Sequence, residues 1–491
     1  MSSWYVKKLI TRPQTLVYVP SPGFFGAGQR EMRQLMTKPL NPSLKFRPNL
    51  EGERALVARN VDLRHGFEVG MRALSAVDVQ LLLAENHKLP PDPSDGRVLD
   101  YVHRTLSQGL PRDLFHKVGV AHVRASSNRG DLSSRSLKTI FEECAERANP
   151  PGQQTPAAAA TTYHISLYGQ RLSIGMSLAG DTALWKRGYK EQMSAVAPLP
   201  ENVAASCVAE ALVAWRGYDY DDKQMWEAQV ETRGPLLVLN PFAGSGTLGF
   251  EAALSLTGLG GTAAFHTAPQ ELGTALGLPD KTLEFLGRKL ATPRAEALPA
   301  LCVAMSDADA DAVAVLSDNV GHFASATGLG TCDADGEGAF EGTGVLARPS
   351  QLHFFEAPIE SFLAPGRLKE RGGGSVLLLL NPPHGRRMGK ESNMNRMYDR
   401  VGARVVELFT AWLEGGHVGG AGKFAGMVVC PTEEAWSIMQ SSISKVAVRG
   451  QVGTGTSSMS AGGLGRATFE TTNFTLGGHH MRCLSFSISP E

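Results

Sequence analysis

Long hydrophobic runs are missing from this chain of 491 residues, and so is any surplus of charge of one sign. No apolar stretch approaches the roughly 20 residues needed to cross a membrane, so we expect a soluble protein. Lysine and arginine number 48, and aspartate and glutamate also number 48, which gives a formal net charge of zero. A globally basic field is therefore excluded, and any surface for nucleic acid has to be local.

Cysteine is also scarce. The six cysteines lie far apart and form no Cys-x-x-Cys pair. This spacing argues against a disulfide framework and against a zinc ribbon, and it fits a reducing compartment. His479, His480 and Cys483 stand close together near the end of the chain. A short His-His-x-x-Cys stretch without further ligands does not make a metal site, so we predict no metal.

Acidic residues are rare at the start of the chain. The first fifty residues hold eight lysines and arginines against the single acid Glu31. We therefore set residues 1–48 apart as a basic N-terminal extension of the kind used for import into mitochondria. The alternative is a basic arm that faces RNA in a cytoplasmic protein.

The rest of the chain divides into two regions of different character. Residues 49–192 mix expected strands with helical patterns, which indicates an α+β region. We expect strands at 55–63 and 117–126, helices at 66–85 and 133–148, and a hairpin at 163–178. In residues 193–491, short apolar strands alternate with helices, which predicts a doubly wound, Rossmann-like parallel sheet; the strands are at 236–240, 301–305, 352–356, 375–380 and 423–430. Segments rich in Gly, Ala or Ser at about 257–300, 326–350 and 450–467 are interpreted as insertions.

The apolar run that ends at Leu380 is followed by Asn381, Pro382 and Pro383. The prolines cannot extend a strand, but they fix the backbone just beyond its end. The Asn381 side chain and the Pro382 carbonyl then offer two oxygens to one amino group, at the edge where open α/β sheets bind ligands. A rigid turn without function is the alternative.

A glycine turn follows the strand at 236–240. Gly244, Gly246 and Gly249 fit G-x-G-x-x-G, which lets a ligand approach the backbone at the start of a helix. The stretch has no Lys-Ser/Thr ending, so a phosphate-gripping loop is disfavoured. The next strand leads to Asp307, a carboxylate suited to a pair of ribose hydroxyls, or else a plain helix cap. A nicotinamide enzyme has no use for Asn-Pro-Pro, whereas a methyl donor bound across the first two strand ends would place its sulfonium near the third.

These motifs resemble those of a known family. The stretches NPFAGSGTLGFEAA at 240–253 and LLNPPHGRRM at 379–388 are similar to the cofactor and amino-group motifs of S-adenosylmethionine-dependent amino-group methyltransferases. Residues 172–212 resemble the segment that joins a THUMP domain to the catalytic domain in guanine-N2 RNA methyltransferases, including the bacterial large-subunit rRNA enzyme. The resemblance implies a ferredoxin-like/THUMP region that binds RNA, followed by a class I methyltransferase domain.

The resemblance also implies roles for single residues. The catalytic set would be Asn381, Pro382, Pro383 and His384, with the first two holding the exocyclic amine of a guanine and His384 stacking on its base. The cofactor set would be Pro198, Glu201, Asn240, Ala243, Gly244, Ser245, Gly246, Thr247 and Asp307. The basic residues that would meet RNA phosphates are Lys186, Arg187, Lys190, Arg386, Arg387 and Lys390.

The chain departs from the family pattern around this pocket. Asn240 replaces the usual acid, Ala243 the cofactor-adjacent cysteine and His384 the usual aromatic residue, and the acid that contacts adenine is replaced near Ala357 or Pro358. Two main hypotheses follow: an active guanine-N2 methyltransferase on rRNA, or a weak or inactive relative that serves mitochondrial ribosome assembly. A tRNA or DNA amino-group methyltransferase and a dinucleotide-dependent enzyme stay open behind them.

Overall fold

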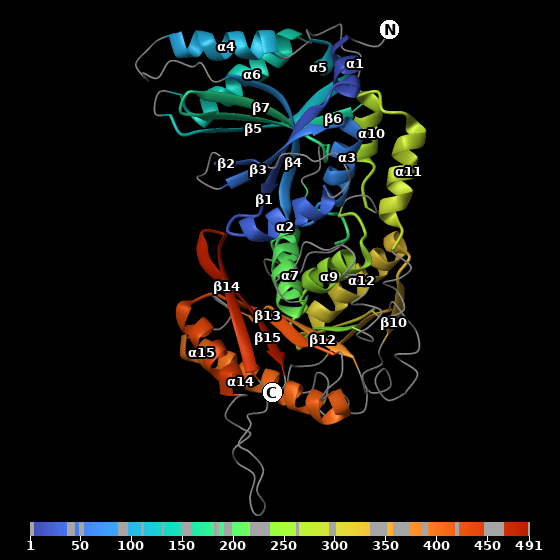
Figure 1. The fold of residues 1–491 in the computed structure, drawn as a ribbon, viewed down its shortest axis with the longest axis vertical. Helices are drawn as coiled ribbons and strands as arrows, with labels where there is room; N and C mark the ends of the chain where they lie inside the picture. The colour runs from blue at the N-terminus through green and yellow to red at the C-terminus, as the bar shows by residue number, and fades with distance from the viewer. Residues whose placement is uncertain are drawn as a thin grey trace, which may run out of the picture. The chain divides into compact units, whose positions relative to one another are not determined.

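A computed structural model describes residues 4–36, 45–48, 54–86, 97–109, 112–129, 132–148, 159–180, 184, 186–190, 199–216, 236–261, 265–293, 301–333, 351–356, 374–383, 391–417, 422–445 and 466–489. The chain forms two compact units, residues 1–188 with 260–292 and residues 189–259 with 293–491 (Figure 1). Each unit is built around one β-sheet.

The first unit contains a seven-stranded sheet in the order β2-β3-β1-β4-β7-β6-β5. Its strands are β1 (Gln14–Pro20), β2 (Lys45–Pro48), β3 (Arg54–Val61), β4 (Ala76–Asn86), β5 (Val118–Ser127), β6 (Ala159–Tyr168) and β7 (Arg171–Ser177). Its helices are α1 (Trp4–Thr11), α2 (Phe25–Leu35), α3 (Leu63–Arg72), α4 (Arg97–Gly109), α5 (Arg112–Lys117), α6 (Ser134–Ala148), α10 (Ala268–Ala275) and α11 (Asp280–Ala291). Sheet and helices share one hydrophobic core.

Strand β1 is an inner strand of this sheet. It pairs antiparallel with β3 on one side and with β4 on the other, and its Leu16 and Tyr18 are fully buried. The sequence interpretation set residues 1–48 apart as an extension, and the structure corrects that boundary. The chain is already part of the folded unit at α1, whose Leu9 is buried in the core, and β1 is an inner strand whose removal would split the sheet in two.

The segment 66–85, expected as one helix, is divided in two. Helix α3 ends at Arg72, and β4 begins at Ala76. Along β4 the side chains alternate: Val79 and Leu81 join the core, while Asp78 and Gln80 lie on the opposite face. This period of two is that of a strand and overrides the helical spacing read across the junction.

The segment 257–300 contains helices α10 and α11, which belong with the first unit. Leu272 of α10 and Leu283 of α11 are buried in that unit's core. Lys289 Nζ lies 2.8 Å from Glu68 Oε1 and so ties α11 to α3. The chain therefore returns to the first unit in the middle of the second.

The second unit contains an eight-stranded sheet in the order β10-β11-β9-β8-β12-β13-β15-β14. Its strands are β8 (Leu236–Asn240), β9 (Leu301–Asp307), β10 (Gly330–Asp333), β11 (Gln351–Glu356), β12 (Ser375–Leu380), β13 (Phe424–Cys430), β14 (Arg466–Leu476) and β15 (His479–Ser489). Its helices are α7 (Glu201–Arg216), α9 (Thr247–Thr257), α12 (Ala310–Thr327), α14 (Glu391–Trp412) and α15 (Glu433–Ser444), with a π-helical turn, η4 (Leu413–His417), after α14.

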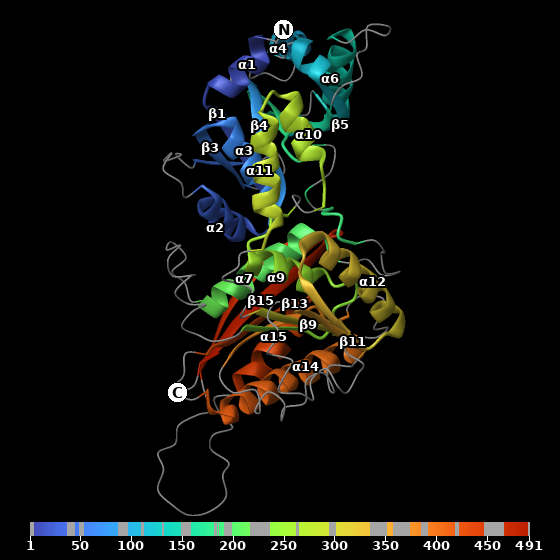
Figure 2. The same ribbon diagram turned by 90° about the vertical axis from the view of Figure 1, so that its right-hand side faces the viewer.

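The six strands β8 to β13 pair in parallel, and the hairpin β14-β15 adds an antiparallel edge. Helices α7, α9 and α12 cover one face of this sheet, and α14 and α15 cover the other (Figure 2). The predicted doubly wound, Rossmann-like sheet is confirmed. In the described part of the chain, no helix is both long and apolar enough to span a membrane.

Candidate active site

Three polar strand ends meet at one edge of the second sheet. Strand β8 ends at Asn240, β9 ends at Asp307, and Asn381 directly follows β12. Strand β8 pairs in parallel with both β9 and β12. The three side chains therefore lie at the carboxyl edge, where the strand order changes direction and ligands bind in folds of this kind.

The glycine turn after β8 needs each of its glycines for a different reason. Gly244 and Gly246 have φ of 52° and 90°, the left-handed region that favours glycine. A Cβ on Gly246 would lie 2.5 Å from the Phe250 ring, and one on Gly249 would lie 2.3 Å from Met305 Sδ. A Cβ on Gly244 would meet nothing within 4 Å. The last two glycines serve packing, and the first leaves open space for a ligand.

Asp307 fixes this turn. Its Oδ2 accepts a hydrogen bond of 2.9 Å from the Gly244 N–H, and its Oδ1 accepts one of 3.2 Å from the Asp309 N–H. Each oxygen keeps a second lone pair, and the side chain is only partly buried. The role of helix cap falls to Asp309, which accepts from Asp311 N at the start of α12. Asp307 is thus free to serve a ligand as well as the turn.

Buried polar atoms gather at the same edge. Among the described residues, Asn240 Oδ1 and Nδ2, Ser306 Oγ and Asn381 Oδ1 have no hydrogen-bond partner. Buried polar groups are nearly always paired in folded proteins, so each exception needs a reason. Three such residues on adjacent strand ends indicate a site built to bind a polar ligand.

Further residues hold the turn in place. Ala243 is buried, and its N–H donates to the Ser306 carbonyl at 2.8 Å. Asn319 of α12 is fully buried and donates to the Ser245 carbonyl at 3.2 Å. Ser245 Oγ lies 3.4 Å from Thr247 Oγ1. The sequence interpretation missed Ser306 and Asn319.

A signal for Asn319 exists in the sequence. It stands between Leu316 and Val320 on the buried face of α12, where an apolar residue is expected. A polar side chain at such a position predicts a buried hydrogen bond. Ser306, one residue before Asp307 in an apolar strand, gives a weaker signal of the same kind.

Lys190 and Glu201 form an ion pair. Lys190 Nζ lies 3.2 Å from Glu201 Oε1, and the two side chains are only 5% and 10% exposed. The sequence assigned Lys190 to RNA and Glu201 to the cofactor. A phosphate cannot reach Lys190 without breaking a nearly buried pair, so the structure corrects the assignment of Lys190. Glu201 starts α7 and is the partner of Lys190.

Tyr189 is held in the second unit by both its hydroxyl and its ring. Its hydroxyl donates to Glu251 Oε1 at 2.7 Å, and both side chains are buried. Its ring packs edge-on against Phe250 and Phe323, which stack on each other with centroids 4.7 Å apart. Phe250 is the residue that Gly246 accommodates, so this cluster and the glycine turn fit together in the second unit.

Arg187 is not an RNA contact in this structure. Its side chain is fully buried, and its guanidinium donates to the carbonyls of Ala73, Leu74 and Leu184. The physical reason is that a buried cation has to satisfy its donors, and backbone carbonyls do so here. The neighbouring Lys186 is exposed.

The remaining predicted residues divide in two. Pro382 is buried and Pro383 half-buried directly after Asn381. Pro198, His384, Arg386, Arg387 and Lys390 lie outside the described residues, as do Ala357 and Pro358. In the part of the chain that the structure describes, no group of three or more His, Cys, Asp or Glu side chains is arranged to hold a metal.

The fold of the chain matches that of solved proteins assigned as methyltransferases. A structure assigned as a methyltransferase, solved in complex with S-adenosylhomocysteine, superimposes with a TM-score of 0.62 at 15% identity, over 97% of this chain and 98% of the other. A structure assigned as an N6-adenine-specific DNA methylase from Listeria monocytogenes superimposes with a TM-score of 0.56 at 16% identity, over 89% and 94% of the two chains. The predicted fold class is confirmed.

Similarity in sequence points to more particular proteins. The chain is 29% identical over 255 residues to the ribosomal RNA large subunit methyltransferase K/L of Allochromatium vinosum. It is 24% identical over 249 residues to the protein of the same name from Saccharophagus degradans. The matches cover 50% and 51% of this chain, and 28% and 27% of the relatives. The chain thus spans less than a third of their length. No protein-family model matches the chain. The resemblance to bacterial large-subunit rRNA methyltransferases drawn from the sequence is confirmed.

Proposed function

We propose that this protein transfers a methyl group from S-adenosylmethionine to a base of RNA. The observation that carries the proposal is the meeting of three strand ends: the glycine turn, Asp307 and Asn381 lie at one edge of a parallel sheet. The similarity to large-subunit rRNA methyltransferases supports an RNA substrate.

The residues of this edge fit the cofactor. Asp307 has lone pairs for a ribose diol, and Gly244 leaves open space beside the backbone. The buried amide of Asn240 has unpaired donor and acceptor atoms among the described residues. It can pair with polar groups of the cofactor without the charge of the family's usual acid. When bound, S-adenosylmethionine supplies an activated methyl group.

The finer proposal is that the acceptor is the exocyclic amine of a guanine in large-subunit rRNA. Asn381 Oδ1 is a buried acceptor with no partner in the described structure. With the Pro382 carbonyl beside it, two oxygens can hold one amine and orient its lone pair. Such a site works by position and electrostatics and needs no strong base.

Nucleoside analysis tests this directly. The purified protein is incubated with rRNA fragments and S-adenosylmethionine labelled in its methyl group, and digested nucleosides are separated and identified by mass spectrometry. We expect label in N2-methylguanosine. Label in another nucleoside contradicts the finer proposal, but the proposal that the protein is an RNA methyltransferase still stands. Cofactor binding without any labelled nucleoside across rRNA fragments favours the ribosome-assembly alternative.

Replacing Asn381 separates chemistry from cofactor binding. We expect Asn381→Ala to lower kcat about a hundredfold, because a misplaced acceptor amine loses its alignment. Its affinity for S-adenosylmethionine should stay within about twofold of the wild type. Equal loss of both quantities would show that Asn381 belongs to the cofactor site instead.

A further inference from the structure

Asn395 of helix α14 carries a buried polar atom that none of the contacts described above explains. Its Oδ1 has no hydrogen-bond partner among the described residues, and the same is true of Asn381 Oδ1. Asn395 is partly buried, and its neighbour Met394 belongs to the core beneath the helix. Because a buried acceptor without a partner lowers stability, such an atom points to a ligand that pairs with it.

The strand register places α14 against the same edge of the sheet as Asn381. By the parallel pairing of β12 and β13, Asn381 is level with Val429. The Tyr398 hydroxyl of α14 donates to the Val429 carbonyl at 2.9 Å, which fixes the height of the helix against the strands. Tyr398 is fully buried, and burial raises the pKa of its hydroxyl, so this donor keeps its proton.

The direction of α14 carries Asn395 past the strand ends. Helix α14 connects the parallel neighbours β12 and β13, so it runs back from the carboxyl edge of the sheet to the amino edge. Asn395 precedes Tyr398 by three residues and lies on the same side of the helix. At a rise of about 1.5 Å per residue, its Cα lies about 4.5 Å further out than that of Tyr398. Asn395 therefore stands over the edge that Asn381 occupies.

The second acceptor restricts which base can bind. Adenine, cytosine and guanine all carry an exocyclic amine. On the Watson–Crick edge, the ring nitrogen beside that amine is a bare acceptor in adenine and cytosine, whereas in guanine it is N1–H, a donor. An amide oxygen beside the oxygen that holds the amine can pair with this N–H, and it repels the lone pair of the other two bases.

We propose that Asn395 selects guanine: its Oδ1 accepts from N1–H of the target base, while Asn381 Oδ1 accepts from the N2 amine. The inference rests on the proposed function, since it assumes a methyl-accepting base of RNA at this edge. A site built to accept from an N–H rejects an analogue that lacks it, because the acceptor then stays unpaired. Asn395 acts on the choice of base and takes no part in the transfer, since no bond at N1 forms or breaks.

An altered base tests this role. The rRNA fragment labelled in the nucleoside analysis is synthesised with either guanosine or 2-aminopurine riboside at the methylated position. 2-Aminopurine keeps the amine but lacks N1–H and O6. We expect the wild type to prefer guanosine about a hundredfold in kcat/KM. Asn395→Leu should lower kcat/KM for guanosine about a hundredfold and leave the value for 2-aminopurine within about twofold.

Two further variants make the result specific. Asn395→Asp keeps an acceptor of the same size but has no amide N–H, so it should keep the preference for guanosine. Loss of the preference in Asn395→Asp would mean that the residue donates to O6, which contradicts the proposal. Asn473→Leu removes an exposed amide from β14 and should change neither value. Thermal unfolding followed by circular dichroism confirms that each variant folds.

A purely structural role for Asn395 gives a different result. Asn395→Leu would then lower kcat/KM for both bases by the same factor, or for neither, and either outcome overturns the proposal. A wild type that methylates both bases equally well also overturns it. Label in adenosine or cytidine in the nucleoside analysis overturns the selection of guanine, while the RNA methyltransferase stands. The absence of any labelled nucleoside is the separate result that overturns the proposed function.

Discussion

Asp307 and Asp78 are both carboxylates on strands, and the structure gives them different surroundings. Asp307 accepts from two backbone N–H groups and keeps lone pairs for a ligand. Asp78 is buried and surrounded by His164, Ser177 and Gln80. Burial alone would raise the pKa of Asp78, but the charge and hydrogen bonds of these neighbours more than offset it, so its pKa is lowered from 3.8.

This lowered pKa predicts the acid behaviour of the first unit. A carboxylate whose pKa is depressed by folding contributes stability above its unfolded value, and that stability is lost as the pH falls through its folded pKa. We expect Asp78→Asn to lower the free energy of unfolding by about 3 kcal/mol at pH 7, because it breaks a buried pair. Urea unfolding from pH 7 to pH 2 should show a smaller loss below pH 4 in the variant. The same pH slope in both proteins would refute this role of Asp78.

Arg187 allows a similar test of a structural role against an RNA role. Its guanidinium donates to three backbone carbonyls, and a lysine ammonium cannot reproduce the planar arrangement of these donors. We expect Arg187→Lys to lower the free energy of unfolding by about 2 kcal/mol. The salt dependence of oligonucleotide binding should not change. An altered salt slope with unchanged stability would restore Arg187 as a phosphate contact. The control is Lys186→Ala, which removes the exposed cation next to the buried Arg187.

At the scale of the element, the turn between β8 and α9 combines several structural requirements of the candidate site. Gly246 combines a left-handed φ with close contacts to Phe250 and Leu316. We expect Gly246→Ala to lower the free energy of unfolding by about 2 to 3 kcal/mol and to abolish cofactor binding, because the turn has to shift. Thermal unfolding and calorimetric titration measure the two effects.

Gly321 provides the matched control. It lies in α12 with nothing within 4 Å of an added Cβ, and its φ is not positive. Gly321→Ala should therefore stabilise the protein by about 0.5 to 1 kcal/mol through helix propensity alone. Equal effects of the two substitutions would mean that the turn tolerates a side chain.

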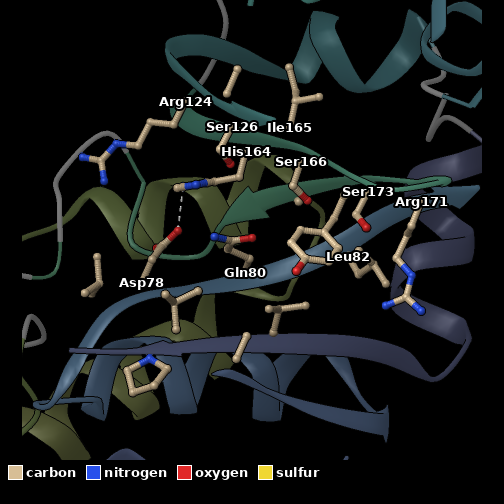
Figure 3. Close-up of a pocket in the computed structure, with 18 of the residues that line it drawn as sticks. Asp78, Gln80, Leu82, Arg124, Ser126, His164, Ile165, Ser166, Arg171 and Ser173 are labelled. Carbon is tan, nitrogen blue, oxygen red and sulfur yellow. Dashed lines mark ion pairs between the residues drawn. The ribbon is translucent and has the colours of Figure 1, made fainter. Parts of the chain in front are cut away.

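The elements that the sequence predicted well are those defined by local pattern. Strands β8, β9 and β12 are short apolar runs bounded by turn residues, and the glycine spacing correctly placed a turn between β8 and α9. Contacts between residues far apart in the chain were not predicted from the sequence. Lys190 and Arg187 looked like surface cations, and only the folded chain brings Glu201 and the carbonyl of Ala73 to them. The polar sheet face around Asp78 and His164 (Figure 3) was not predicted for the same reason, because its side chains come from strands far apart in the chain.

At the scale of the whole molecule, the chain contains two sheets with different polar surfaces. The first unit presents a polar sheet face with arginine, tyrosine and serine side chains. The second unit presents a parallel sheet whose edge collects the glycine turn, Asp307 and Asn381. Helices α10 and α11 interrupt the second unit in sequence and belong with the first, so the two units cannot be separated by a single cut.

The measurement that tests the central claim most directly is calorimetric titration of S-adenosylmethionine into the full-length protein. We predict micromolar binding that Asp307→Ala weakens about a hundredfold, through the loss of hydrogen bonds to a charged group. Asp311→Ala, which removes an exposed carboxylate four residues away, should bind like the wild type. No detectable binding by the folded wild type, or equal binding by Asp307→Ala, would contradict the account.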